Sequence, residues 1–527
     1  MPCQLTLVDQ PRLWIGGCDC PDFNAASGIR HRKSPDSSVI SPAAVTLHTL
    51  GFNTDSPPDS PCHVGTLSRP ARYKNSSSHT SRYTPFTPPQ NPAMHTVFIL
   101  AVALCVAAFL LALFHVVPLP SPSWATSINP LEYQQRKFAD WGRQYGDVVY
   151  AKLFRTPALV LNSKEAAQDL LEKKSAKYSD RPDFILLSEL MGWDSVITHM
   201  PYGDRFRKHR KWIQDAFQYK RAVMSYRRIH FRETYTLLTG LLQKPEDFMA
   251  HIKRWSAGMI LEITYGHRVM SLNDKYIKIA ERATVETVRA GSPGSMLVDF
   301  FPILKVLPIW APGAGFKRDA LKIRGLVRTM LDTPFNMVKV AMATGTALPS
   351  FTAALLEDTL CHGSASATDE EDIKGAAGVL FGAGTDTTVT VLSTFVLAMV
   401  LHPEVYKKTQ EEIDRVVGHD RLPDFDDRDA LPYLECVLRE VYRWNPPVPL
   451  ACPGQLFADT SLWLAMANIA ATLDIHKALD SSGREITPEP LFHSGFVSHP
   501  HEFICDFRPR SEKALGMVAQ MSAHVDV

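Results

Sequence analysis

The stretch DIKGAAGVLFGAGTDTTVTVLSTFVLAMVL, residues 372–401, decides the fold, because it is almost unbroken apolar sequence around one polar island. As a helix, about thirty residues span about 45 Å, enough to cross a whole domain. Thr368 with Glu371 three residues later predicts a capping box at the start, and His402-Pro403 predicts the end. A helix this long and apolar has to run through the centre of a domain.

The polar island is AGTDTT, residues 383–388. Gly382, Gly384 and the threonines are poor helix formers, costing up to about 1 kcal/mol each relative to alanine. We therefore expect a widened or kinked turn there, with a groove beside it. In such a groove the alcohol of Thr387 and the acid of Asp386 can donate and relay protons to a bound ligand. The alternative is a core helix whose threonine hydroxyls bond back to the preceding turn.

A second informative segment is Cys452-Pro453-Gly454, which is followed at once by an apolar helical run over residues 455–465. A cysteine just before a helix N-terminus lies in a field that favours the thiolate. A thiolate is one of the few protein ligands that can hold haem iron. The alternative is that Cys452 is a small buried residue at a turn.

The third segment is Glu440-Val441-Tyr442-Arg443, on a helix that we expect over residues 431–444. Three residues apart, Glu440 and Arg443 share one face of that helix. The alternative is an ordinary surface ion pair, which contributes well under about 1 kcal/mol.

In this order along the chain, the three segments resemble the motifs of the cytochrome P-450 family of haem-thiolate monooxygenases. Two further segments are similar to family motifs: YGDRFRKHR at 202–210, which resembles the C-helix segment, and YSDRP at 178–182. The resemblance covers roughly residues 130–527. The residue pattern of this region, including SGFVSHP at 494–500, is similar to that of fungal members of the O-methylsterigmatocystin oxidoreductase type.

The resemblance implies a mainly α fold with small β-sheets behind an N-terminal transmembrane helix. It also implies a haem b cofactor with Cys452 as the axial ligand of the iron and Arg210 on a haem propionate. Asp386 and Thr387 would deliver protons during oxygen–oxygen bond cleavage. The motif of residues 440–443, with Glu440 and Arg443, would brace the loop beneath the haem.

The implied activity is insertion of one oxygen atom from dioxygen into an apolar small molecule. NADPH would supply the electrons through a separate NADPH–cytochrome P-450 reductase. The similarity to fungal members favours a polycyclic or aromatic substrate, in secondary metabolism or xenobiotic oxidation.

The chain departs from the family pattern before the cysteine. Only about eight residues separate Arg443 from Cys452, where the family has several tens. The absent stretch holds cavity-lining strands, a meander with an arginine, and a Phe-x-x-Gly bulge. We therefore expect a deletion between 443 and 452, arising from either a misassembled gene model or a spliced product. The rival hypothesis is a haem-deficient, inactive membrane protein of the same ancestry. Two smaller departures are a short span over 119–129 and Phe206 in place of a tryptophan.

Charge and cysteine usage narrow the class of protein. The 527 residues carry 56 basic and 55 acidic side chains, so no global field favours a nucleic-acid partner. Nine cysteines without a CxxC pair indicate folding in the reducing cytosol. The local basic cluster, residues 205–211, is either a solvated helix face or is shared between haem propionates and a docking patch for the reductase.

The N-terminal part has two regions. Residues 1–93 are dense in Ser, Pro, Thr and His, which indicates a disordered extension. Residues 97–117 are almost wholly apolar and long enough to cross a bilayer as an anchor ahead of a catalytic domain over 118–527. A cleaved signal peptide and a buried core helix are the alternatives. Met94 lies just ahead of the span, so a native chain that begins there is a further alternative.

The flanking charges of the span, Arg136 and Lys137 behind it and Arg82 ahead, favour a cytosolic C-terminal part. We expect a single-pass protein of the endoplasmic reticulum membrane with the lipid bilayer as a partner. Asn75-Ser76-Ser77 is a glycosylation sequon that would then face the lumen.

Helical spacing predicts five further helices, and strand alternation predicts one hairpin. The helices are expected at 131–143, 163–174, 205–217, 221–243 and 319–344, the last interrupted at Pro334. The hairpin is expected over 147–161 with a turn near Thr156-Pro157. The proline-rich apolar segment 293–312 either caps the substrate cavity at the membrane or is an ordinary apolar loop.

Overall fold

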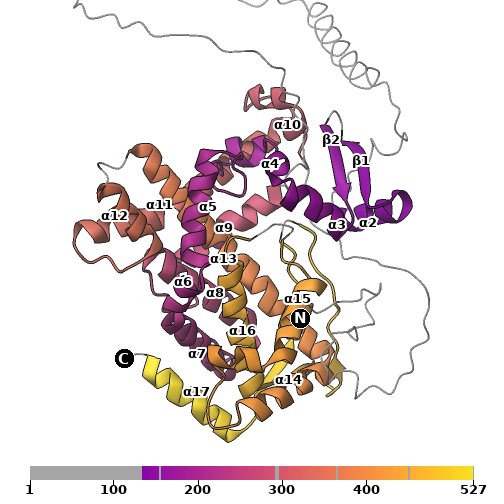
Figure 1. Ribbon diagram of the computed structural model, residues 1–527, viewed down its shortest axis with the longest axis vertical. Helices are drawn as coiled ribbons and strands as arrows, with labels where there is room; N and C mark the ends of the chain where they lie inside the picture. Colours follow the sequence, from indigo (N-terminus) through magenta and orange to yellow (C-terminus); the bar gives the residue numbers. More distant parts are fainter. Residues whose placement is uncertain are drawn as a thin grey trace, which may run out of the picture. The chain divides into compact units, whose positions relative to one another are not determined.

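Helices make up most of the described structure. The computed structural model describes residues 133–153, 156–290, 296–361, 363, 366–448, 452–495 and 497–525. The predicted extension over 1–93 with its sequon at Asn75, and the predicted anchor over 97–117, lie outside these residues. The prediction of a mainly helical fold with small sheets is confirmed (Figure 1).

Many of the helices contact one central helix, α13. In chain order the longer helices are α2 (Gln134–Tyr145), α5 (Asp204–Phe217), α6 (Lys220–Ser225), α7 (Arg227–Gln243), α8 (Phe248–Tyr265), α9 (Lys275–Ala290), α11 (Gly315–Ala343), α12 (Phe351–Cys361), α13 (Ala367–Leu401), α14 (Pro403–Val416), α15 (Pro432–Trp444), α16 (Gln455–Thr472) and α17 (Glu512–Val525). Shorter helical segments are α3 (Lys164–Ala167), η1 (Gln168–Lys173), α4 (Ser175–Tyr178), η2 (Ile185–Leu190), η3 (Pro245–Asp247), α10 (Leu297–Phe300), η4 (Pro302–Val306) and η5 (Phe425–Ala430).

Two small antiparallel sheets complete the fold. Strands β1 (Val148–Leu153) and β2 (Thr156–Leu161) form a hairpin beside α2 and α3 (Figure 1). In the second sheet β3 (Leu473–Leu479) lies between β4 (Glu485–Ile486) and β5 (Cys505–Pro509). The predicted hairpin is therefore confirmed. The chain reverses between Leu153 and Thr156, directly before the predicted Thr156-Pro157, and both of those residues belong to β2.

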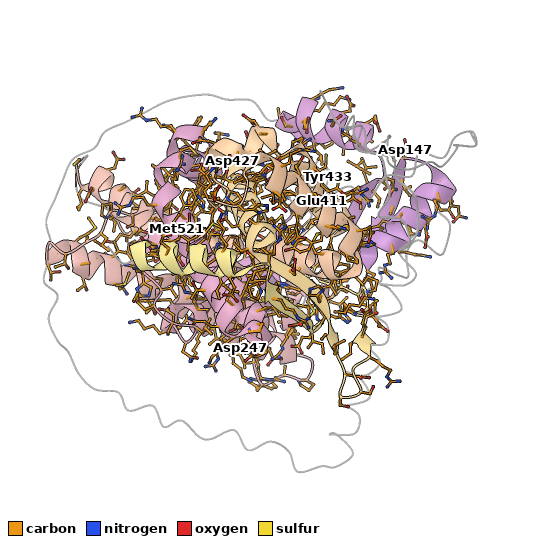
Figure 2. The ribbon with its side chains drawn as sticks, turned by 90° about the horizontal axis from the view of Figure 1, so that it is seen from below. Asp147, Asp247, Glu411, Asp427, Tyr433 and Met521 are labelled. Atoms are coloured by element: carbon orange, nitrogen blue, oxygen red, sulfur yellow. The ribbon has the colours of Figure 1, made fainter. Side chains whose placement is uncertain are left out.

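Side chains fill the space between the helices (Figure 2) and form one large hydrophobic cluster. Its largest fully buried members include Trp255, Trp463, Phe335 and Phe395. A separate small cluster under the hairpin joins Phe138 and Trp141 of α2 to β1 and β2. The α2–hairpin unit thus has its own packing, apart from the main core.

Helix α13 occupies the centre that the sequence predicts for it. It contacts α5, α8, α9, α11, α12, α14, α15, α16 and β3. It is the one described helix long and apolar enough to cross a membrane, and 72% of its most apolar window is buried within the protein, as in a core helix. Its predicted end is confirmed at Leu401, where Pro403 begins α14.

The start of α13 differs from the prediction. Ser366 is the N-cap, and it forms a reciprocal capping box with Asp369. The box predicted from Thr368 and Glu371 is wrong because Glu371 instead binds Arg328 of α11 and Lys374. The Glu371 carboxylate therefore takes part in ion pairs and does not cap the helix.

At two places the helices also differ from those that the sequence periodicity predicts. The segment 221–243 is divided into α6 and α7 at Tyr226. The predicted interruption at Pro334 is wrong, since α11 is continuous through it. Pro334 is buried, so packing on both sides of the residue outweighs a local penalty of about 3 kcal/mol for proline inside a helix.

Candidate active site

A short opening interrupts the burial of α13. From Gly375 to Val400 every residue is buried except the run 382–387, in which Ala383 is exposed and the other five are half-buried. This run coincides with the polar island and with the proposed proton-delivery pair, Asp386 and Thr387. The middle of the central helix is therefore accessible only where its chemistry-bearing side chains lie.

The helix does not break at this opening. Residues 367–401 are α-helical throughout, so the predicted widened turn is wrong. The hydroxyl of Thr387 donates to the Ala383 carbonyl at 2.8 Å, and that of Thr388 donates to the Gly384 carbonyl at 2.7 Å. The alternative in which the threonines bond back to the preceding turn is therefore confirmed for Thr387 and Thr388, whereas the buried Thr385 hydroxyl has no hydrogen-bond partner among the described residues. To donate to a ligand, the Thr387 hydroxyl has to break its hydrogen bond to the Ala383 carbonyl.

Other parts of the protein pack closely against the glycines of α13. A Cβ atom on Gly384 would lie 2.9 Å from Ile260 Cδ1 of α8, and one on Gly375 would clash with the Ser195 carbonyl. The Ser256 hydroxyl of α8 also reaches the Gly384 and Thr385 carbonyls, at 3.3 and 2.9 Å. Glycine is needed at these positions because a larger side chain would collide with the neighbouring elements.

Asp386 has a partner that the sequence did not reveal. His499 Nε2 lies 3.0 Å from Asp386 Oδ1, and His499 Nδ1 lies 2.8 Å from the Thr390 hydroxyl. His499 belongs to the SGFVSHP segment, to which the motif assigned no role. The separation of more than a hundred residues leaves no periodic signal for this contact.

Cys452 lies two residues before the N-cap of α16, Gly454. Its side chain is exposed, yet enough protein surrounds it that desolvation raises the pKa of the thiol. The Gly454 amide and the positive charge of Arg210 lower that pKa, while the negative charge of Asp459 raises it. The thiolate-favouring field predicted at the helix N-terminus is thus outweighed, and the net pKa is raised.

The carboxyl group near the thiol is held by a tyrosine. The Tyr442 hydroxyl donates to Asp459 Oδ1 at 2.7 Å, which joins α15 to α16. Desolvation raises the pKa of Asp459, although the Tyr442 bond opposes this. Desolvation and the nearby Asp459 raise the pKa of Tyr442 far above its usual range. Neither residue had been singled out, because each is unremarkable within its own helix.

Glu440 and Arg443 form the predicted pair on one face of α15. Arg443 donates from Nε to Glu440 Oε2 at 2.7 Å and from Nη2 to Oε1 at 2.6 Å. The side chains are 16% and 26% exposed, so this bidentate pair is half-buried. An ordinary exposed surface pair does not describe it, because bidentate geometry and partial desolvation strengthen the contact.

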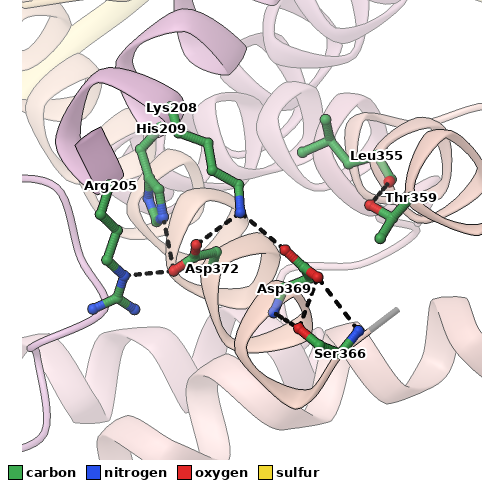
Figure 3. Close-up of polar contacts among 8 residues, drawn as sticks. All are labelled: Arg205, Lys208, His209, Leu355, Thr359, Ser366, Asp369 and Asp372. Carbon is green, nitrogen blue, oxygen red and sulfur yellow. Dashed lines mark hydrogen bonds and ion pairs between the residues drawn. The ribbon is translucent and has the colours of Figure 1, made fainter. Parts of the chain in front are cut away.

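The basic cluster of α5 divides between structural and site positions. Arg205 Nε and Lys208 Nζ bind the two oxygens of Asp372 at 2.5 and 2.9 Å, and His209 Nε2 lies 3.3 Å from Oδ1 (Figure 3). Asp372 is only 4% exposed. Arg205 and Lys208 thus brace α5 against α13, whereas Arg207 and Lys211 of the same cluster are exposed, as on a solvated helix face. Arg210, by contrast, acts on Cys452 through its charge.

The chemistry of the donor set fits a haem-thiolate centre. The thiol of Cys452 is exposed at the head of a helix, the Gly454 amide and the Arg210 guanidinium both favour its anion, and α13 is open only at its acid–alcohol pair. A soft thiolate with amide donors is the ligand type that haem iron accepts.

Comparisons with known proteins show the family of this chain. The family model "Cytochrome P450" matches residues 118–466. Cytochrome P-450 monooxygenase 136 of Postia placenta is 42% identical over 463 residues, with 74% of this chain and 88% of that protein covered. Cytochrome P-450 monooxygenase claR of Ampulloclitocybe clavipes is 35% identical, with 72% and 84% covered.

A solved structure confirms the fold independently. A zebra fish cytochrome P-450 determined with progesterone superposes with a TM-score of 0.58 at 18% identity, and 71% of this chain and 99% of that chain are covered. The chain belongs to the cytochrome P-450 family. It is thereby a haem-dependent monooxygenase by family, with a cysteine thiolate ligand, a redox partner and a hydrophobic substrate as the family's general requirements.

Proposed function

We propose that this protein inserts one oxygen atom from dioxygen into an apolar polycyclic or aromatic small molecule, in secondary metabolism or xenobiotic oxidation. The observation that carries the proposal is the opening over residues 382–387, which exposes Asp386 and Thr387 in the middle of an otherwise buried helix. The fungal relatives, at 31–42% identity, support the monooxygenase class.

Four residues would hold the haem b group. Cys452 would be the axial ligand of its iron, and Arg210 would bind a propionate and favour the thiolate. The half-buried pair of Glu440 and Arg443 would stiffen the end of α15 that leads to the cysteine. When bound, the haem supplies the redox chemistry by which dioxygen is cleaved.

Asp386 and Thr387 would move protons. Asp386 is half-exposed, so it can exchange protons with water. Thr387 would turn its hydroxyl from the Ala383 carbonyl toward the opening, at the loss of one hydrogen bond of about 1 kcal/mol. An acid and an alcohol in adjacent positions form a short route from solvent into the opening.

Electrons would come from NADPH through NADPH–cytochrome P-450 reductase, and the protein would act at the endoplasmic reticulum membrane, anchored by residues 97–117 with its catalytic part in the cytosol. The apolar length of that segment supports the anchor. Deletion of residues 1–117 should release the protein from microsomes washed with alkaline carbonate. Retention in the pellet would count against a single anchor.

The decisive experiment is the carbon monoxide difference spectrum of the reduced protein, with isotope-labelled dioxygen supplied to active preparations. A chain with the missing segments restored should show the thiolate-type band and transfer one labelled oxygen to product. Cys452→Ser should lose the band, while Cys436→Ser, a buried cysteine of α15 away from the proposed ligand position, should keep it. Product without label would exclude a monooxygenase.

A second candidate is a haem-deficient protein of the same ancestry, and two observations favour it. The pKa of Cys452 is raised, with the carboxyl group of Asp459 nearby. The alignment with the Postia protein runs over 463 residues but uses 74% of the 527 in this chain, about 390. The relative therefore has residues opposite gaps here, which supports the predicted missing segments. The same spectrum separates the two candidates.

A further inference from the structure

His499 bridges two successive turns of α13 from the C-terminal loop. Its Nε2 faces Asp386 Oδ1 at 3.0 Å and its Nδ1 faces the Thr390 hydroxyl at 2.8 Å. We propose that His499 is the positioning residue for the Asp386 carboxylate, which it holds on the side of α13 that faces this loop. The inference rests on the proposed function, in which Asp386 relays protons.

The number of protons available decides which atom donates. An ionised carboxylate only accepts, so the proton of this contact is on Nε2. Thr390 has one hydroxyl proton, which goes either to Nδ1 or to the Asp386 backbone carbonyl 3.1 Å away. In the first case Nδ1 accepts from Thr390, and in the second Nδ1–H donates to the Thr390 oxygen. In both cases Nε2–H points at Asp386.

The loop is fixed before its histidine reaches the helix. The Asn445 side chain at the end of α15 donates to the Ser498 carbonyl at 2.7 Å and lies 3.2 Å from the Thr394 hydroxyl. The Ser498 amide donates to the Pro447 carbonyl at 3.2 Å. Positions 386, 390 and 394 are one turn apart, so His499 and Asn445 follow one face of α13. A side chain on a backbone held in this way is preorganised.

This contact limits the freedom of the acid. Asp386 and His499 are 31% and 30% exposed, so water reaches the carboxylate, but one of its oxygens is already bound. Without His499 the carboxylate is free to rotate about its side-chain torsions. A relay group has to lie within hydrogen-bond reach of its proton donor and acceptor, so that freedom weakens proton delivery beside Thr387.

Carboxyl labelling tests the contact in the 527-residue chain without need of haem. Asp386 is labelled with a carbodiimide and glycine ethyl ester, and the extent is read by mass spectrometry. We expect His499→Leu to raise labelling of Asp386 roughly tenfold, the factor for loss of a hydrogen bond to a charged group. Thr390→Val, which keeps shape but loses the bond to Nδ1, should raise it roughly threefold.

The conservative variant separates positioning from mere packing. A glutamine side chain can donate from its NH2 group to Asp386 and accept the Thr390 hydroxyl at its carbonyl oxygen, so His499→Gln should stay within about twofold of wild type. His501→Leu is the matched loop control, since His501 stacks on His493 at 4.2 Å. Low labelling of Glu233, 1% exposed, confirms that each variant is folded. Equal labelling of Asp386 in wild type and in the leucine and valine variants overturns the proposal.

A second measurement addresses the reaction in haem-loaded enzyme, with the missing segments restored if the present chain retains no haem. Product formed per NADPH should fall about tenfold in His499→Leu, with KM unchanged, and recover in His499→Gln. Full coupling in the leucine variant overturns the positioning role. Absence of the thiolate-type band in wild type is a failure of the proposed function instead, and the labelling result still decides the contact.

Discussion

The opening in α13 and the cysteine ahead of α16 are built in different ways. Residues 382–387 are placed by one continuous helix, whose hydrogen bonds join near neighbours in sequence. Cys452 lies two residues before the N-cap of α16, and desolvation raises the pKa of its thiol. A helix repeat suffices to place an acid beside an alcohol, whereas a thiolate ligand depends on segments that support it from elsewhere in the chain.

The largest expected effect concerns the cysteine side. Haem content and the carbon monoxide difference spectrum should be compared between the 527-residue chain and a chain with the segments between Arg443 and Cys452 restored. We expect the thiolate-type band only from the restored chain, because the proposed deletion would remove strands and amide donors that stabilise the ligand. A normal band from the 527-residue chain would show that Cys452 reaches the iron without that scaffold, and the contrast between the two regions would disappear.

On the helix side, Thr387→Ala should leave haem and substrate binding intact in the restored enzyme but divert electrons to peroxide. Product formation should fall on the order of 10- to 1,000-fold, the range for loss of a proton-transfer group. Thr387→Ser keeps the hydroxyl and is the matched control. Unchanged coupling of NADPH use to product in the alanine variant would remove Thr387 from the mechanism.

The attachment of α13 to α5 can be weakened away from the opening. Asp372→Asn should lower the free energy of unfolding by about 2 kcal/mol in urea titrations. This is less than for a fully buried pair, because Arg205 and Lys208 are more than a third exposed and regain water. Glu370→Gln, which breaks a partly exposed pair with Lys339, should change stability by no more than about 0.5 kcal/mol.

The ion pairs of Asp372 with Arg205 and Lys208 also predict that stability depends on pH. Desolvation acts to raise the pKa of Asp372, but the bonds from Arg205 and Lys208 outweigh it and the pKa lies below 3.8. The stabilisation is therefore present above pH 3.8 and is lost as the pH falls through the lower, folded-state pKa. The difference between wild type and Asp372→Asn should shrink over that interval. A difference that grows on acidification would contradict the assignment.

The smallest expected effect is on the reactivity of Cys452 in the 527-residue chain. Asp459→Asn should lower the pKa of the thiol and speed its alkylation by iodoacetamide at neutral pH about two- to fivefold, as an interaction of 0.5–1 kcal/mol allows. Arg210→Gln should slow it by a similar factor. Cys361, also exposed, serves as the internal reference for both variants. Equal rates in the two variants would mean that neither charge reaches the thiol.

Much of the helix side was predictable from sequence. The end of α13 at Leu401, its central position and the Glu440–Arg443 pair follow from apolar length, a proline and a spacing of three. The start was placed wrongly because Glu371, within reach of a local cap, binds Arg328 of another helix instead. The expected widened turn was wrong: α13 stays α-helical there, and Ile260 and Ser256 of α8 pack against the glycine-containing turn.

By itself the sequence determined which residues share a helix, which face they lie on and which family motifs they form, because hydrogen bonds and side-chain neighbours three or four positions apart repeat along a helix. Only the tertiary structure decided the partners of those residues. The contact of His499 with Asp386, the cations around Asp372 and the carboxyl group of Asp459 near Cys452 join distant segments. Desolvation and charge at such contacts depend on what packs there, and no local periodicity records it.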